Sequence, residues 1–215
     1  MSDKPQTNVV AVLTGDIVKS QSLSDLVFNA TIKALKEQLQ GYSSKYQGDY
    51  DIFRGDAFQF VTQQPHKIID VAVALRLSLK AMSPSIDIRI SCAVGNASFR
   101  QGEIKTGTGE AFVVSGRGLD KLKTQYIAFD SAYESISHTH LLTRFADTHL
   151  AGLTQTQSET VLAYLMSEDK NHDSVASSLG KNRSNITRIL NASHYKLIAD
   201  YLDYMEQHIK TAMQA

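Results

Sequence analysis

The sequence has a single cysteine, Cys92, which excludes an internal disulfide and a zinc site built from several thiolates. No apolar run approaches the roughly 20 residues that a membrane-spanning helix needs, and the polar first ten residues are unlike a secretory signal peptide. Equal numbers of acidic and basic residues give a net charge of zero. That balance argues against a protein that coats nucleic acid non-specifically, but it allows a local basic face. We therefore expect a cytoplasmic globular protein with no membrane partner, in which Cys92 is a small buried side chain.

Two aspartates are each expected where strands end or turn. Val9–Leu13 is a continuous apolar run, which predicts a buried strand that finishes near Asp16. Residues 50–62 place apolar side chains on both sides of Gly55-Asp56, which predicts a β-hairpin with Asp56 at its turn. We expect Asp16 and Asp56 to face one another and to hold Mg²⁺, which prefers oxygen ligands such as carboxylates. Taken alone, Asp16 is better explained as a helix cap and Asp56 as a turn residue, and it is the pair in this order that favours a site.

A phosphate group is expected beside these carboxylates. The backbone after Asp16 turns toward a helix start, where N–H groups can hold phosphate oxygens. Arg117 is expected to stabilise negative charge on the phosphate through its fork of donors, although a surface ion pair explains it equally well. His138 and His140, two residues apart, are interpreted as solvated side chains and not as metal ligands. The backbone positions expected to hold phosphate are Ile17, Val18, Lys19 and Ser20.

The remaining periodicity predicts an α/β (α+β) fold with a mixed sheet and helices covering a face. The expected helices span 22–46, 65–83, 110–123 and 133–150, and further strands span 86–94 and 126–130. Gly95 is expected to end the strand over 86–94. Leu26 and Met82 are expected in the buried stripes of the first two helices.

A shift in composition near Leu150 divides the chain into two predicted domains, 1–150 and 151–215. In the second, Thr154 and Gln157 have the spacing of a capping box that opens a helix. A short helix over 174–179, a turn at Gly180 and a long helix from Arg183 have the layout of a helix-turn-helix. The alternative is an ordinary three-helix bundle with a cationic face.

The long helix has the composition of a recognition helix, because no acidic residue occurs between Lys181 and Ala199. Its first residues would meet base edges and phosphates in the major groove of double-stranded DNA. The residues expected to bind DNA are Lys181, Asn182, Arg183, Ser184, Asn185, Thr187 and Arg188. The apolar stripe that follows is expected to pair with a second copy, since two-fold dimers suit palindromic sites. That stripe consists of Leu202, Met205 and Ile209.

Four segments resemble, in order, the motifs of class III nucleotide cyclases: TGDIVKS, RGDAFQFV, IDIRISCAVGNASF and GEAFVVSGRGLDKL. The GDI and GDxFQ motifs are similar to those of the SatD family. This resemblance covers Val9–Asp130 and implies a palm-like cyclase fold with a mixed sheet of ferredoxin type, with Mg²⁺ on Asp16 and Asp56 and a nucleotide ligand. The segment that begins LTQTQ resembles the region of sigma factors that ends in the recognition helix.

The chain departs from the cyclase pattern at three places. Val113 stands where cyclases carry an asparagine four residues before the helix arginine. Ile52 and Phe53 occupy the region of the purine-reading lysine, and Gly95-Asn96 replaces a Gly-Glu pair. These departures favour ligand binding over efficient catalysis.

The sequence therefore predicts a DNA-binding transcriptional regulator whose N-terminal cyclase-like domain binds or senses a nucleotide or phosphate ligand, and which forms a homodimer. One alternative is an active Mg²⁺-dependent nucleotidyl cyclase or nucleotidyltransferase. The other is a degenerate cyclase-like domain that serves only dimerisation.

Overall fold

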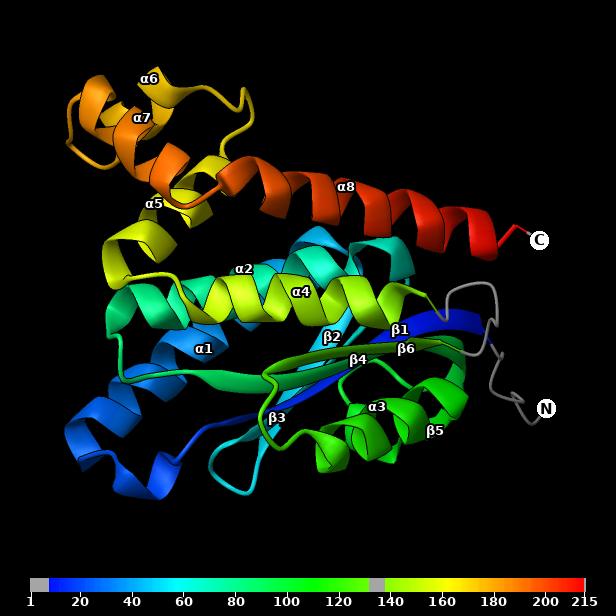
Figure 1. Cartoon of the computed structure of the whole chain (residues 1–215). Coiled ribbons are helices and arrows are strands. Elements are labelled where there is room, and N and C mark those ends of the chain that lie inside the picture. The colour runs from blue at the N-terminus through cyan, green and yellow to red at the C-terminus, as the bar shows by residue number, and fades with distance from the viewer. Residues whose placement is uncertain (1–7, 132–137, 215) are drawn as a thin grey trace.

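The computed structural model describes residues 8–131 and 138–214, which form layers around one sheet (Figure 1). The strand order is β2-β3-β1-β4-β5, and β6 also pairs with β4. Every pairing is antiparallel except that of β4 with β6, which is parallel. The predicted mixed sheet is therefore confirmed. The strands are β1 (Asn8–Ile17), β2 (Gly48–Phe53), β3 (Ala57–Thr62), β4 (Ile88–Ser98), β5 (Thr108–Gly109) and β6 (Ile127–Ser131).

Helices cover both faces of this sheet. Figure 1 shows α3 on one face, α1, α2 and α4 on the other, and α8 as a further layer over α2 and α4. The helices are α1 (Asp25–Lys45), α2 (Ile68–Met82), α3 (Glu110–Lys121), α4 (Thr139–Ala151), α5 (Gln155–Met166), α6 (His172–Ser178), α7 (Arg183–Ala192) and α8 (Tyr195–Ala212). Within the described ranges, none of them is long and apolar enough to cross a bilayer.

Successive residues of β1 face opposite sides of the sheet, as the geometry of a strand requires. Val10 and Val12 belong to a small core beneath α3. Ala11 and Leu13 belong to the main core, which α1 and α2 complete on the other face. Cys92 is fully buried in that main core, as predicted, and burial raises the pKa of its thiol.

The predicted hairpin is confirmed, since β2 and β3 pair in register from Gly48↔Thr62 to Phe53↔Ala57. Gly55, in the turn, adopts a φ of +88°, a conformation that glycine tolerates without steric cost. β1 continues one residue beyond Asp16. This aspartate is therefore the next-to-last residue of the strand.

Two expectations about buried stripes were wrong. Leu26 is 82% exposed, because the fully buried residues of α1 begin only at Thr31 and, in the first turn, it is the partly buried Phe28 that packs against the core. Met82 is 40% exposed at the end of α2. The body of α2 is buried on nearly all sides, because it lies between the sheet and the helices α5 and α8. A helix apolar all round is typical of such a position.

The predicted bounds of the strand over 86–94 were also wrong. β4 begins two residues later and continues through Gly95 to Ser98, because β1 pairs with it from Ile88 to Ala97 and β5 pairs with its last two residues. Ser91 of β4 is buried. The predicted helix over 133–150 is observed as α4, and its first residues, 133–137, lie outside the described ranges.

The predicted long helix from Arg183 is two helices. The chain breaks at Ser193-His194, where His194 has a left-handed φ of 47°, and α8 then starts in a new direction. The stripe of Leu202, Met205 and Ile209 does not face a second copy, because α8 buries it against the rest of the same chain. The main core is continuous from the sheet to α8, and a domain boundary at residue 150 stays a prediction.

Candidate functional site

The two predicted carboxylates meet in one cavity of about 500 Å³ at an edge of the sheet. β1 and β3 place them there, since Asp16 is the register partner of Ala57 and the Ile17 N–H donates to the Asp56 carbonyl over 3.1 Å. The juxtaposition of Asp16 and Asp56 that the sequence suggested is thus present in the structure. The cavity is lined by Asp16, Ile17, Val18, Lys19, Ser20, Gln21, Asp56, Arg89, Lys123, Thr124, Gln125 and Tyr126.

Arg89 holds Asp16 in a bidentate pair that was not predicted from the sequence. Its Nε donates to Asp16 Oδ1 over 2.9 Å and its Nη2 to Oδ2 over 2.5 Å, while Nη1 donates to the Leu122 carbonyl over 3.0 Å. The hydrogen bond to Asp16 raises the pKa of the Arg89 guanidinium. The two residues are register partners on β1 and β4, so only the strand register could have revealed the pair.

Some of the expected phosphate donors are already used within the chain. The Ile17 N–H donates to the Asp56 carbonyl, and the Val18 N–H to the Asp87 carbonyl over 2.9 Å. Ser20 donates its hydroxyl to the Asp56 carboxylate. The positive charge that an anion would meet in the cavity comes from the side chains of Lys19, Arg89 and Lys123.

Arg117 is not brought to this cavity. It lies exposed on α3, one helical turn beyond Val113, which is 47% exposed. The opposite side of α3 packs on the sheet so closely that a Cβ on Gly118 would lie 2.1 Å from Ser91 Oγ. The predicted contact of Arg117 with a phosphate stays a prediction, with no support from its position in this chain.

The donor set at the cavity does not fit a Mg²⁺ site with two carboxylate ligands while Arg89 occupies both oxygens of Asp16. In the described part of the chain, no group of three or more His, Cys, Asp or Glu residues could hold a metal ion. A metal role for Asp16 and Asp56 stays a prediction, and it would require Arg89 to release Asp16.

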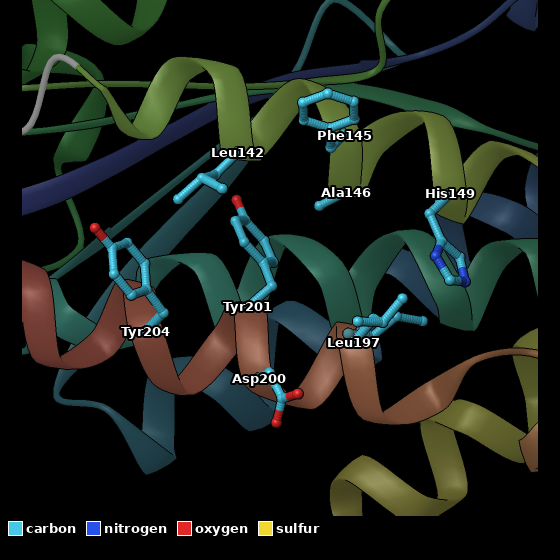
Figure 2. Close-up of a pocket in the computed structure, with 9 residues that line it drawn as sticks. Leu142, Phe145, Ala146, His149, Leu197, Asp200, Tyr201 and Tyr204 are labelled. Atoms are coloured by element: carbon cyan, nitrogen blue, oxygen red, sulfur yellow. The ribbon is translucent and has the colours of Figure 1, made fainter.

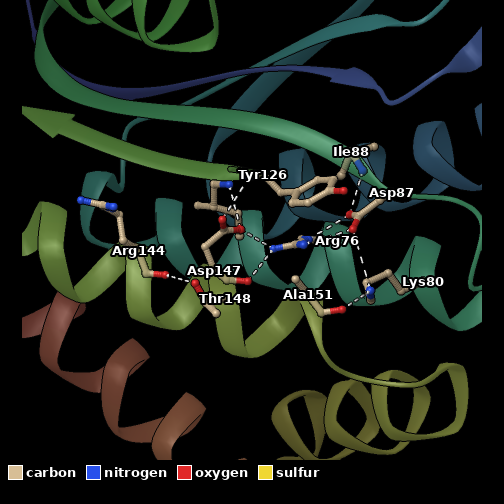
Figure 3. A network of polar contacts seen from close by, with 10 residues as sticks. Arg76, Lys80, Asp87, Ile88, Tyr126, Arg144, Asp147, Thr148 and Ala151 are labelled. Carbon is tan, nitrogen blue, oxygen red and sulfur yellow. Dashed lines mark hydrogen bonds and ion pairs between the residues drawn. The ribbon is translucent and has the colours of Figure 1, made fainter. Parts of the chain in front are cut away.

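A buried charged network supports the wall of the cavity (Figure 3). Arg76 of α2 is fully buried and donates to Asp87 over 2.9 and 3.1 Å and to Asp147 Oδ1 of α4 over 2.5 Å. Its guanidinium also lies 4.4 Å from the ring centroid of Tyr126. Lys80 completes the network through Asp87, at 3.8 Å.

This network holds two parts of the cavity rim. The Asp87 carbonyl accepts from Val18, and the Asp147 carboxylate accepts from the Tyr126 and Ile127 N–H groups over 3.1 Å each. Burial raises the pKa of the Asp147 carboxyl, against the opposing effect of Arg76. Because the N–H groups and Arg76 all donate to this carboxylate, the network fixes the position of residues that line the cavity.

The helices α5, α6 and α7 pack on one another in the order that a helix-turn-helix requires. Thr154 and Gln157 form the predicted capping box at the start of α5. Asn171 caps α6, which begins two residues before the predicted start. Gly180 turns the chain with a φ of +60°, and the small, buried Ala176 lies in the helix before it.

The seven residues predicted to bind DNA gather around the N-terminal end of α7, but several have partners. Asn182 caps α7 by accepting from the Asn185 N–H over 2.8 Å. Thr187 contacts His172 Nδ1 over 2.9 Å. Ser184 and Arg188 are exposed.

Acidic residues of the preceding helices offset the basic charge around α7. Lys181 pairs with Glu159 of α5 at 2.5 Å. Arg183 pairs with Asp173 of α6 at 3.1 Å, where both side chains are about two-thirds exposed. The surface around α7 is therefore less positively charged than residues 181–199 alone suggest, because acidic residues from α5 and α6 lie beside it.

No family model matches the chain, and no curated protein matches its sequence. The solved structures to which the chain is similar include the following three nucleotide cyclases. A bacterial light-regulated adenylyl cyclase is 18% identical, with 58% of this chain and 77% of that chain covered and a TM-score of 0.45. The guanylyl cyclase Cya2 is 16% identical (65% and 80% covered, TM-score 0.46). The adenylyl cyclase CyaB from P. aeruginosa is also 16% identical (59% and 78% covered, TM-score 0.47). Likeness of this degree carries no information on ligand or activity.

Proposed function

We propose that this chain is a DNA-binding regulator whose α/β part binds a nucleotide or phosphate ligand. The observation that carries the proposal is the exposed N-terminal end of α7, held by α5 and α6. In proteins of this layout, that end of the second helix meets base edges in the major groove. The Arg183–Asp173 pair is an exposed ion pair, of a kind that contributes about 0–1 kcal/mol, so a DNA phosphate can replace Asp173 at little cost.

Replacing Arg188 with alanine is expected to weaken binding to duplex DNA and to reduce its salt slope by about one. Fluorescence anisotropy with a mixed-sequence duplex over a salt series measures both quantities. Lys33→Ala removes a positive charge that is likewise exposed, on α1, and serves as the matched control. Equal affinity of wild type and Arg188→Ala, or an equal loss in the control, would contradict this recognition surface.

The cavity at Asp16 supports the ligand part of the proposal. Its volume of about 500 Å³ is ordinary for a small-molecule site. An arginine guanidinium forms bidentate hydrogen bonds with carboxylates and phosphates alike. A ligand phosphate can therefore replace Asp16 as the partner of Arg89. That exchange would free the Asp16 carboxylate next to Asp56. Two carboxylates and a phosphate would then be available as ligands for Mg²⁺. We therefore expect nucleotide and Mg²⁺ each to bind with higher affinity in the presence of the other.

Thermal unfolding with ATP, GTP or cyclic nucleotides, each with and without Mg²⁺, tests this ligand site. A ligand present at about 100 times its dissociation constant is expected to stabilise the fold by roughly 2.7 kcal/mol. Asp56→Asn is expected to remove the additional shift caused by Mg²⁺, and Arg89→Gln the shift caused by the nucleotide. No shift with any nucleotide would instead support a degenerate domain that serves dimerisation.

The meeting of Asp16 and Asp56 in one cavity also favours one alternative, an active Mg²⁺-dependent nucleotidyl cyclase or nucleotidyltransferase. Such an enzyme would release pyrophosphate from a nucleoside triphosphate, and Asp56→Asn would abolish the release. Binding without pyrophosphate release would leave the regulator as the better description.

A further inference from the structure

Five large apolar side chains are exposed on one side of the molecule, where α4 lies beside the first half of α8. Phe145 is 66% exposed, Leu197 61% and Leu141 56%, and Tyr204 and Leu142 are 41% and 38% exposed. We call these five residues the α4–α8 face. The other large exposed apolar side chains of the described ranges are distributed over α1, α2, α3 and α5.

A groove of about 450 Å³ runs between the two helices of this face (Figure 2). Leu142, Phe145, Leu197 and Tyr204 line it together with more deeply placed side chains, and its acidic lining residue is Asp200. The groove lies between helices that are fixed relative to each other.

Two hydrogen bonds fix α4 to the helices beside it. The Tyr201 hydroxyl of α8 bonds to Thr143 Oγ1 over 3.0 Å, and His149 Nε2 of α4 contacts the Ser193 carbonyl over 2.7 Å. The apolar surface is therefore a feature of the packed structure and not of loosely held side chains.

We propose that the α4–α8 face pairs with the same face of a second copy of this chain in a two-fold dimer. The five side chains leave on the order of 500 Å² of apolar surface in contact with water. A standard interface buries about 800 Å² on each partner, and roughly two-thirds of a homodimer interface is apolar. The face therefore has about the apolar area that one partner of such a dimer supplies.

The charges at its edges suit a contact between identical faces. Arg144 is exposed on α4 next to Phe145, and Asp200 borders the groove from α8. In a two-fold interface, when one residue contacts a second residue of the partner, the reverse contact also forms. The two-fold axis that joins the apolar faces can thus form two equivalent ion pairs, each between Arg144 of one copy and Asp200 of the other. The pairing rests on this surface alone and on neither DNA nor nucleotide binding.

The mass of the full chain in solution, measured by sedimentation equilibrium, tests the proposal. We expect the wild type to form a dimer. Phe145→Asp is expected to raise the dimer dissociation constant by about 30-fold or more, as for a central interface residue. Val113→Asp places the same charge on an exposed apolar position of α3 and is expected to leave the dimer intact. Unchanged circular dichroism of both variants shows that they are folded.

A charge exchange sharpens the test. Arg144→Asp and Asp200→Arg are each expected to weaken the dimer, and the two together to restore it. A monomeric wild type would overturn the proposal, including one that binds lipid vesicles or a small apolar dye through this face. A dimer that Phe145→Asp leaves unchanged would overturn it equally, because the interface would then lie elsewhere.

Discussion

Replacing Arg76 with methionine is expected to lower the free energy of unfolding by about 3–5 kcal/mol. Methionine approximates the length of the arginine stem, but it leaves Asp87 and Asp147 without their shared buried cation. Asp147 would remain buried with backbone N–H groups as its hydrogen-bond donors and without the cation that offsets its burial. The cost therefore comes mainly from an uncompensated charge and not from lost packing volume.

Thermal unfolding measures this cost. For a chain of this length, about 2–4 °C of Tm corresponds to 1 kcal/mol, so the expected decrease is roughly 6–20 °C. Arg100→Met, at an exposed arginine, is the matched control and is expected to change little. If the carboxylates are the cause, replacing Asp87 and Asp147 with apolar residues in the Arg76→Met background should recover part of the loss. A decrease below about 1 kcal/mol would contradict the assigned role of the network.

A fragment of residues 151–215 is expected not to fold by itself. In the whole chain, α5 packs on α2, and α8 packs on α2 and on the turn before it at Pro65–Lys67. Removal of α2 would expose the side of α8 that carries Leu202, Met205 and Ile209. A core in a fragment this short rarely supplies more than about 3–5 kcal/mol even when complete.

Circular dichroism and urea titration of the fragment provide the measurement. We expect weak helicity and no cooperative transition, whereas the whole chain should unfold cooperatively. Met205→Gln in the whole chain is a useful companion, because it places a polar group in the same core and should destabilise without deleting any element. A fragment that unfolds cooperatively would support the domain boundary predicted near Leu150.

Local signals allowed much of the fold to be predicted. The hairpin at Gly55, the capping box at Thr154 and the turn at Gly180 each depend on a few neighbouring residues, and all three are present. Leu26 was misassigned because helical periodicity does not tell where along a helix contact with the sheet begins. The break at His194 was missed because its left-handed backbone has no glycine to mark it.

The site was predictable only in part, for the same reason. Asp16 and Asp56 could be brought together from the order of the strands, without knowledge of the exact pairing. The partner of Asp16 depends on the register of β1 against β4, and a shift of one residue would have turned Arg89 to the other face of the sheet. The position of Arg117 depends on which side of α3 packs on the sheet, and close approach at Gly118 decides that.

The burial of α2 on nearly all sides also has a consequence for the order of folding. The contacts that cover it come from β1 and α1 before it, from β4 directly after it, and from α5 and α8, near the other end of the chain. Contacts between residues distant in sequence form slowly, because the entropy of closing the intervening loop must be lost first. During synthesis on the ribosome, an apolar side of α2 would therefore remain uncovered until α8 had emerged, and would be a natural binding surface for a chaperone in the interval.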